Sequence, residues 1–274
     1  MEDTNRLLNR KALAEANFAT YADPLVSEAI EHASALQAGA DAEKLHKLRV
    51  ALRRLRTLLW AYRPILDENF DNQQRELLKS LASAAGNTRD WDILIGLVEK
   101  DSDAALVNAF NGNRNETAEK SAETLRNSHI DETLRDGISE AHRELSGAPT
   151  QTPLTRFARK RVRAAQQQLK KRMRHAAKVG SSDYSSYHDV RKAGKKVRYL
   201  IEFFDPLLEK KQRKGLKRLK RLQKDFGALN DVVASRNLLA SRRASLPNDV
   251  DVKPALRRLR KVQKRRIKAA SKLL

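Results

Sequence analysis

Apolar residues recur along this chain every three to four positions, which is the spacing of one face of an α-helix. No stretch shows the apolar–polar alternation and β-branched content that are typical of a strand. The pattern predicts an all-α fold, with helices near residues 6–22, 24–38, 43–63, 70–86, 89–100, 103–126, 129–145, 153–178, 185–204, 208–226, 229–244 and 254–273. Proline and glycine mark the expected breaks, because they end or turn helices. These breaks are Pro24, Gly39, Pro64, Gly147–Pro149, Gly180–Ser182, Pro206, Pro247 and Pro254.

The longest stretch without a helical pattern, near residues 146–153, divides the chain into residues 1–150 and 151–274. The two parts resemble each other. The segment that begins at His46, HKLRVALRRLR, aligns with the segment that begins at His188, HDVRKAGKKVR, at an offset of 142 residues. Such an internal repeat predicts two pseudo-symmetric helical bundles that pack together.

Each repeated segment separates into two faces when its residues are placed at 100° intervals. One face of the first segment carries His46, Arg49, Arg53 and Arg56, and the opposite face carries Leu48, Leu52, Leu55 and Leu59. In the second segment the two sets are His188, Arg191, Lys195 and Arg198, and Val190, Val197, Ile201 and Phe204. We therefore expect each helix to bury its apolar stripe and to present a row of cationic groups.

The charge of the chain is large and unevenly distributed. Lys and Arg number 56 against 34 Asp and Glu, which gives a net charge of +22. Residues 1–150 hold 19 basic and 25 acidic residues, a net charge of −6, whereas residues 151–274 hold 37 and 9, a net charge of +28. Such a field favours a negatively charged partner, and nucleic acid, polyphosphate and an anionic membrane surface all satisfy that condition.

Further basic rows occupy the second half. The predicted helix 153–178 places Arg156, Arg159, Lys160, Arg163, Lys170 and Arg174 within about 100° of arc. Lys214, Lys217 and Arg221 repeat the pattern in the following helix, and Arg257, Arg260, Lys261, Lys264 and Lys268 repeat it near the C-terminus. Like charges at these spacings destabilise a helix by a few tenths of a kcal/mol per pair. Their accumulation indicates a polyanion that neutralises them.

The basic faces favour a ligand that is mostly backbone phosphate. Arginine binds phosphate oxygens in pairs, and lysine acts as a mobile point charge. Reading of nucleic-acid bases would need exposed aromatic residues or mixed amide and arginine side chains. Aromatic residues make up only 5% of the chain. Trp60 and Tyr199 lie near the basic arcs, and we interpret both as bundle packing.

At these residues the chain resembles the CHAD family, the conserved histidine α-helical domain. The resemblance rests on the two repeated His-x-x-Arg helices, each followed by Gly-x-x-x-Asp, at Gly86–Asp90 and Gly227–Asp231, and covers residues 10–245. It implies two pseudo-symmetric helical bundles with basic residues around a central cleft or pore. It also implies binding of inorganic polyphosphate and, for stand-alone members, association with polyphosphate granules.

The family's ligand contacts transfer to His46, Arg49, Arg53, Arg54, Arg56, His188, Arg191, Lys195, Lys196 and Arg198. The chain departs from the pattern at Gly194, where an aliphatic residue is expected, and at Lys195 and Lys196, where arginine is expected. The lysines reduce the scope for paired hydrogen bonds to phosphate. The glutamate-rich strands of the triphosphate tunnel domain, which accompanies many family members, do not occur in this chain.

Catalytic and metal-binding patterns do not stand out. The six histidines show no i, i+4 pair and there is no cysteine, so we expect no metal site and no cofactor. We interpret Asp90 and Asp231 as helix caps or internal ion-pair partners. Because His46 and His188 recur beside cations, we expect a bound phosphate to favour their protonated form, and binding to tighten as the pH falls.

These patterns predict a non-catalytic polyphosphate-binding protein. Two alternatives stay open at this point, a nucleic-acid-binding protein and an enzyme, or an accessory subunit of one, that acts on polyphosphate or triphosphates. We expect no membrane span, because no apolar window is long enough. The segment Met1–Asn5 lacks the features of a secretory signal, so we expect a cytoplasmic protein, on polyphosphate granules where these form.

Overall fold

The computed structural model describes residues 12–39, 41–99, 103–148, 151–180, 183–243, 246 and 251–274. These residues form helices and turns without any strand, so the all-α prediction is confirmed. The helices are α2 (Phe18–Ser34), α3 (Ala42–Tyr62), α4 (Glu68–Ala84), α5 (Asn87–Val98), α6 (Ala104–Asn127), α7 (Ile130–Ser146), α8 (Leu154–Val179), α9 (Tyr184–Phe204), α10 (Lys210–Arg213), α11 (Leu216–Arg242) and α12 (Lys253–Ser271). Within the described ranges no helix is long and apolar enough to cross a membrane.

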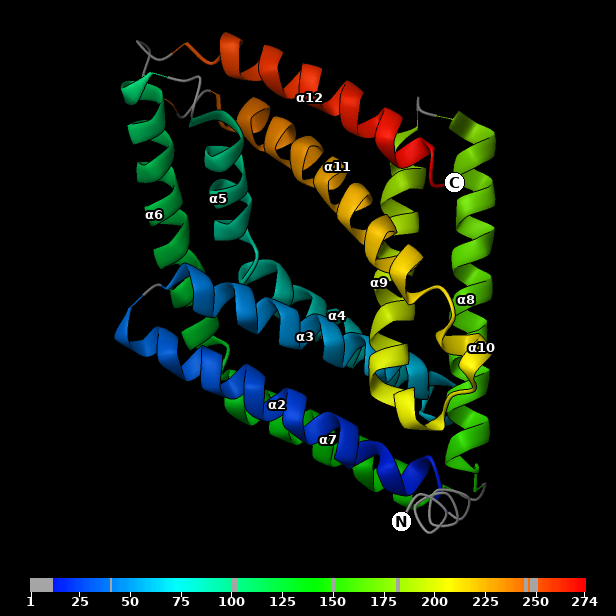
Figure 1. The fold of residues 1–274 in the computed structure, drawn as a ribbon. Coiled ribbons are helices and arrows are strands. Elements are labelled where there is room, and N and C mark those ends of the chain that lie inside the picture. Colours follow the sequence, from blue (N-terminus) through cyan, green and yellow to red (C-terminus); the bar gives the residue numbers. More distant parts are fainter. Residues whose placement is uncertain are drawn as a thin grey trace.

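The helices are arranged as the sides of a four-sided frame (Figure 1). Helices α2, α3, α4 and α7 form one side, α5 and α6 the second, α11 and α12 the third, and α8 and α9 the fourth. Helix α2 packs along α3, and α8 along α9. The two helices that carry the repeated basic segments, α3 and α9, contact each other where two sides of the frame meet.

Two of the predicted boundaries between helices are wrong. Pro24 lies inside α2. Proline has no amide hydrogen, so the carbonyl of Thr20 loses its helical hydrogen bond. Both residues are exposed, and water can bind that carbonyl instead. Gly227 lies inside α11, so the two helices predicted for 208–226 and 229–244 are one helix from Leu216, preceded by the short α10. The predicted helix start at residue 6 and the breaks at Pro149, Ser181–Ser182 and Pro247 fall outside the described residues.

An aromatic cluster joins the first half of the chain to the second. Tyr62 is fully buried and packs against Phe18, with ring centroids 4.9 Å apart, and against Phe157, at 4.8 Å. Phe157 in turn contacts Phe204 at the end of α9. Burial of large aromatic side chains contributes several kcal/mol each, so this cluster fixes the ends of α3 and α9 relative to each other.

Backbone hydrogen bonds connect the same two parts. The amide of Ala14 donates to the carbonyl of Thr152 at 2.8 Å, and the amide of Leu154 donates to the carbonyl of Ala12 at 2.8 Å. The start of α8 is thereby attached to the segment before α2.

Both clusters of buried apolar residues contain residues from before and after position 150. The larger includes residues of α2, α3, α4, α7, α8, α9 and α11. The smaller lies between α5, α6, α11 and α12, with Trp91, Phe110, Val232 and Leu259 among its members. The division into repeats at residue 150 stays a prediction, and the described core is continuous across it.

Candidate anion-binding cleft

The cleft arises because α3 and α9 bury their apolar stripes and leave their basic faces toward each other. Both helices begin at an aspartate: Asp41 accepts hydrogen bonds from two amides of the first turn of α3, and Asp183 from one of α9. The predicted apolar stripes are buried: Leu48, Leu52, Leu55 and Leu59 in α3, and Val190, Val197, Ile201 and Phe204 in α9. The opposite faces carry the cations.

A cavity of about 440 Å³ lies between these faces and is lined by side chains of α3, α4, α8 and α9. Nine of its sixteen lining residues are arginine or lysine: Arg49, Arg53, Arg56, Arg75, Arg172, Arg191, Lys192, Lys195 and Lys196. His188, Trp60 and Tyr199 also line it, and Asp189 is the one carboxylate of the lining. Asp189 forms ion pairs with Arg172 at 2.9 Å and with Lys192 at 3.0 Å, which leaves a strong excess of positive charge.

The inner part of the cleft surrounds Lys195. Burial is the main cause that lowers its pKa to about 6, and the neighbouring charges of Arg53, Arg191 and Arg49 lower it further. Burial also lowers the pKa of Arg53 and Arg191. The Nε atoms of both arginines are buried without a hydrogen-bond partner among the described residues. An unpaired buried donor is costly, so an anion that accepts hydrogen bonds from these guanidinium groups would stabilise the cleft.

The outer part of the cleft surrounds Lys196. Its ammonium lies 4.0 Å from the centroid of the Trp60 ring, and the guanidinium of Arg161 lies 4.2 Å from the same centroid. Burial, followed by the charges of Arg75, Arg161, Arg172 and Arg56, lowers the pKa of Lys196 to about 8. Trp60 is therefore more than bundle packing, since it lines the cleft and contacts two cations.

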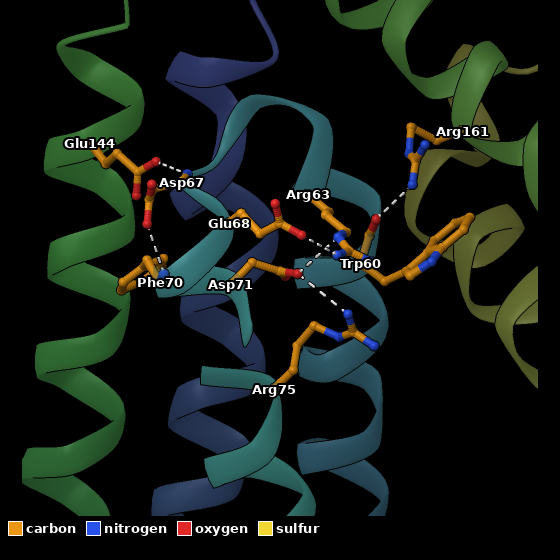
Figure 2. A network of polar contacts seen from close by, with 9 residues as sticks. All are labelled: Trp60, Arg63, Asp67, Glu68, Phe70, Asp71, Arg75, Glu144 and Arg161. Atoms are coloured by element: carbon orange, nitrogen blue, oxygen red, sulfur yellow. Dashed lines mark hydrogen bonds and ion pairs between the residues drawn. The ribbon is translucent and has the colours of Figure 1, made fainter. Parts of the chain in front are cut away.

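A buried carboxylate holds the edge of the cleft in place (Figure 2). Asp71 of α4 has no exposed surface and forms ion pairs with Nε of Arg63 at 3.4 Å and with Nη1 of Arg75 at 3.3 Å. In the same network, Arg161 donates to the carbonyl of Trp60 at 2.7 Å. Because a buried carboxylate is stable only when it is paired, Asp71 restricts where Arg75 can point. Arg75 is thus positioned at the cleft before any ligand arrives.

The two repeated histidines have different surroundings. His188 lines the cleft, and its Nδ1 lies 2.9 Å from Oδ1 of Asn230, which also accepts a hydrogen bond from Tyr184. His46 is half-buried beside Arg49, Arg53 and Arg89 but is not part of the cavity lining, and its Nδ1 has no described partner. Burial is the main cause that lowers the pKa of both imidazoles, and nearby arginines add to it.

Asp90 of α5 and Asp231 of α11 lie near the arginines that surround Lys195. Burial raises the pKa of Asp90, the charge of Asp231 raises it further, and Arg49 and Arg191 oppose the shift. Asp90 lies in the first turn of α5, but the residue before that helix is Gly86, which provides no side-chain cap. Asp231 lies in the middle of α11, so the capping interpretation is wrong for it. Both carboxylates instead partly balance the arginines.

Besides His46, two residues expected from the resemblance do not line the cleft. Arg54 forms an ion pair with Glu28 at 3.5 Å and lies over the ring of Phe203. Arg198 forms an ion pair with Glu202 at 2.8 Å and a hydrogen bond with Gln223 at 2.9 Å. The guanidinium of each is engaged by side chains of the protein itself, so it is less available to a ligand than Arg53 or Lys195.

The additional basic rows predicted for the second half do not converge on the cleft. Arg156, Lys160 and Arg163 are exposed on α8, and Arg159 forms an ion pair with Glu209 at 3.1 Å. Lys170, Arg174 and Lys214 border a separate groove of about 410 Å³ whose walls include Met173, Ile201 and Leu219. Lys217 and Arg221 border a shallow hollow beside Leu274. These rows lie over apolar packing or at the outer surface.

A larger hollow of about 610 Å³ lies between α4 and α6 and has a different chemical character. Its lysines are paired with acids: Lys79 lies 2.7 Å from Glu76, and Lys120 forms an ion pair with Glu116. With Arg242, three cations line this hollow against two carboxylates, so its excess of positive charge is far smaller than that of the cleft and it is a poorer site for a polyanion. No cluster of three or more metal-ligating side chains occurs in the described parts of the chain.

Comparison with known proteins places this architecture in a family. The family model for the CHAD domain matches residues 20–240, which is most of the chain. The chain belongs to the CHAD family. CHAD domains are associated with polyphosphate- and triphosphate-related proteins.

Solved structures show the same CHAD fold. The crystal structure of the CHAD domain from the plant Ricinus communis matches 96% of this chain and 92% of its own length, with a TM-score of 0.79 and 26% sequence identity. PptA from Streptomyces chartreusis matches with a TM-score of 0.64 over 96% of each chain, at 14% identity. A search of curated proteins gives no significant match.

Gly86, the glycine of the first repeated motif, makes room for a cationic side chain of the cleft. A Cβ atom at this position would lie 2.9 Å from Nε of Arg49 and 3.1 Å from the carbonyl oxygen of Ala82. We expect Gly86→Ala to displace Arg49 and to weaken the binding of tripolyphosphate about three- to tenfold, since one charge-assisted hydrogen-bonding group is lost. Isothermal titration calorimetry measures this change.

Gly227→Ala is the matched control for Gly86→Ala. Apart from its chain neighbours and the backbone of its own helix, no atom lies within 4 Å of a Cβ at Gly227, which is inside α11. Alanine there should leave tripolyphosphate binding unchanged and raise stability by up to about 1 kcal/mol. Unchanged binding in Gly86→Ala, with native helix content by circular dichroism, would contradict the role of Gly86.

Proposed function

We propose that this protein binds inorganic polyphosphate in the cleft between α3 and α9 and does not itself turn it over. One observation carries the proposal: nine Lys and Arg side chains from four helices line a single cavity against one carboxylate. A ligand that consists of closely spaced phosphates satisfies this arrangement, because arginine and lysine both bind phosphate oxygens. Membership of the CHAD family supports the same ligand class.

The geometry favours polyphosphate over nucleic acid. Binding of single-stranded nucleic acid relies on aromatic faces against which bases stack. In the cleft, the Trp60 ring is contacted by Lys196 and Arg161, and Tyr199 is only 5% exposed. Neither ring offers a free face to a base, whereas the cationic groups that bind phosphate are plentiful. DNA is therefore the runner-up ligand and the natural competitor.

The proposal that the protein is not catalytic rests on the groups in the cleft. In many phosphoryl-transfer enzymes a carboxylate holds the metal ions or positions the nucleophile beside the phosphate. Asp189, the carboxylate of the lining, is engaged by Arg172 and Lys192. Purified protein incubated with polyphosphate and Mg²⁺ should release no orthophosphate above the protein-free control. Release that scales with protein concentration would contradict this part of the proposal.

Competition tests the ligand directly. Fluorescently labelled polyphosphate is bound to the protein, and unlabelled polyphosphate or single-stranded DNA is added at equal phosphate concentration. We expect polyphosphate to displace the label at least tenfold more effectively than DNA, because the cleft offers cations but no stacking surface. A preference for DNA would overturn the proposed function.

Paired charge-removal variants locate the site. Arg53→Gln with Lys196→Gln removes one arginine and one lysine from the cleft, and Arg156→Gln with Lys160→Gln removes the same charges from the outer face of α8. Each lost phosphate contact should reduce the slope of log affinity against log salt by about 0.7 to 1, so the cleft variant should lose about two contacts and the outer variant none. Equal losses would place the ligand outside the cleft.

Polyphosphate affinity should rise as the pH falls from about 8.5 to about 5.5, because bound phosphate favours protonated groups. The lysines share this effect with the histidines: the pKa of Lys196 is about 8 and that of Lys195 about 6. The pKa values of His46 and His188 lie below the ordinary value of 6.5. Lys195→Arg with Lys196→Arg should therefore flatten the upper part of the profile, and His46→Ala with His188→Ala only the part below about pH 6.5.

Titration of binding at fixed ionic strength measures these profiles. If the paired histidine variant keeps the wild-type dependence below about pH 6.5, the histidines play no part in ligand binding. An affinity that does not change with pH across the whole range would contradict the assignment of the ligand to the lysine-containing cleft.

A further inference from the structure

Lys195 has a position that differs from those of its neighbouring lysines. It lines the cleft, and its amine forms no hydrogen bond or ion pair with any described residue. Lys192 is paired with Asp189, and Lys196 lies over Trp60 and 3.5 Å from Oε1 of Gln168. The Lys195 amine is therefore open to a molecule that enters the cleft and is not tied to a partner.

Burial, and after it the surrounding positive charge, lowers the pKa of the Lys195 amine and favours its neutral form. Arg49 and Arg53 face it from α3 and Arg191 from its own helix, and Asp231 of α11 opposes their effect only in part. Together with burial they lower its pKa to about 6, against 10.5 for an ordinary lysine. A neutral lysine amine carries a free electron pair and is a nucleophile.

The same arginines that keep Lys195 neutral attract phosphate. The Nε atoms of Arg53 and Arg191 are buried without described partners, and arginine binds phosphate through two parallel hydrogen bonds. A small molecule with a phosphate group next to an electrophilic carbon would thus be held beside the amine. Holding two reacting groups together in this way raises the rate of their reaction.

We propose that Lys195 is a covalent modification site for small acyl phosphates. The neutral Nζ attacks the carbonyl carbon, a new C–N bond forms, and the bond between the carbonyl carbon and the phosphate oxygen breaks. Orthophosphate leaves with that electron pair, and the proton released from nitrogen passes to the phosphate or to water. The products are an N-acylated lysine and orthophosphate, and no oxidant, reductant or metal is consumed.

Acylation of Lys195 makes the cleft a poorer anion site, a consequence that rests on the proposed function. The amide cannot take up a proton, whereas the free amine can do so when a polyanion binds. The acyl group also occupies part of the cavity of about 440 Å³. Conversely, bound polyphosphate should protect Lys195, because it excludes the acyl phosphate and favours the protonated amine.

The test treats the full chain with acetyl phosphate and measures the initial acetylation rate at each lysine by mass spectrometry. Lys160 and Lys214, which are exposed, serve as internal references. At about pH 7.5 an ordinary lysine is neutral in only about one molecule in a thousand, so Lys195 should react about tenfold faster even after allowing for its weaker basicity. Its rate should level off above about pH 7, while the reference rates continue to rise.

Two controls separate amine reactivity from phosphate capture. A neutral acetylating reagent, the N-hydroxysuccinimide ester of acetate, lacks the phosphate and should favour Lys195 less strongly than acetyl phosphate does. Lys195→Arg should remove the fast-reacting site and leave the rates at Lys160 and Lys214 unchanged.

An acetylation rate at Lys195 no higher than that of the exposed lysines would overturn the proposal. So would a rate at Lys195 that still rises above about pH 8. Equal selectivity with both reagents would overturn the part that assigns phosphate capture to the arginines. Fast labelling that polyphosphate fails to suppress would support the modification site and count against polyphosphate as the occupant of the cleft. The two proposals therefore fail separately.

Discussion

The structure depends on a concentration of like charge that the fold itself brings together. Helices α3 and α9 each bury an apolar stripe, and most of the cations on their opposite faces line the shared cleft. Each cation that enters this space loses water and meets other cations, and both effects oppose ionisation. The depressed pKa of Lys195, about 6, is the clearest sign of that constraint.

The rest of the molecule offsets this repulsion without removing it. The aromatic cluster of Tyr62, Phe157 and Phe204 fixes the ends of both helices, so the cleft cannot relax by separating them. Asp71 is buried with Arg63 and Arg75, and Asp90 and Asp231 lie near Arg49 and Arg191. These acids position individual arginines but leave nine Lys and Arg side chains, Lys195 among them, against one carboxylate along the lining. Under the proposed function, a polyanion in the cleft supplies the missing counter-charge, so ligand binding and stability are linked.

The sequence predicts the orientation of the helices that form the cleft better than it predicts the residues that α4 and α8 contribute to the lining. The spacing of Leu48, Leu52 and Leu55 opposite Arg49 and Arg53 is enough to predict which face of α3 is buried. The position of Arg75 at the cleft is not predictable in this way. Arg75 lies in the acidic half of the chain, and its sequence spacing predicts only an ion pair with Asp71 four residues earlier. Arg172 lies off the most basic row of α8, and that row proves to face outward.

Positions that depend on tertiary packing are the ones that sequence patterns miss. Gly227 is a helix breaker by propensity, yet buried Phe226 and Leu229 hold α11 together across it. Arg54 carries the repeated motif but pairs with Glu28 of α2, 26 residues earlier, which no helical spacing indicates. Arg198 instead pairs with Glu202 one turn later in its own helix, which the i, i+4 spacing does indicate. The pKa of Lys195 likewise follows from helices distant in sequence, so it could not be read from its own segment.

Thermal unfolding of wild type and Lys195→Met at neutral pH without ligand tests the central claim most directly. Since Lys195 gives up its proton on folding, replacing it with an uncharged side chain should raise the unfolding temperature, by about 2–4 °C for each kcal/mol of relief in a chain of this size. Because the unfolded lysine has a pKa near 10.5 and the folded one near 6, this advantage should be largest below pH 6 and shrink as the pH rises toward 10.5. An unfolding temperature that is unchanged or lower in the variant would contradict the account.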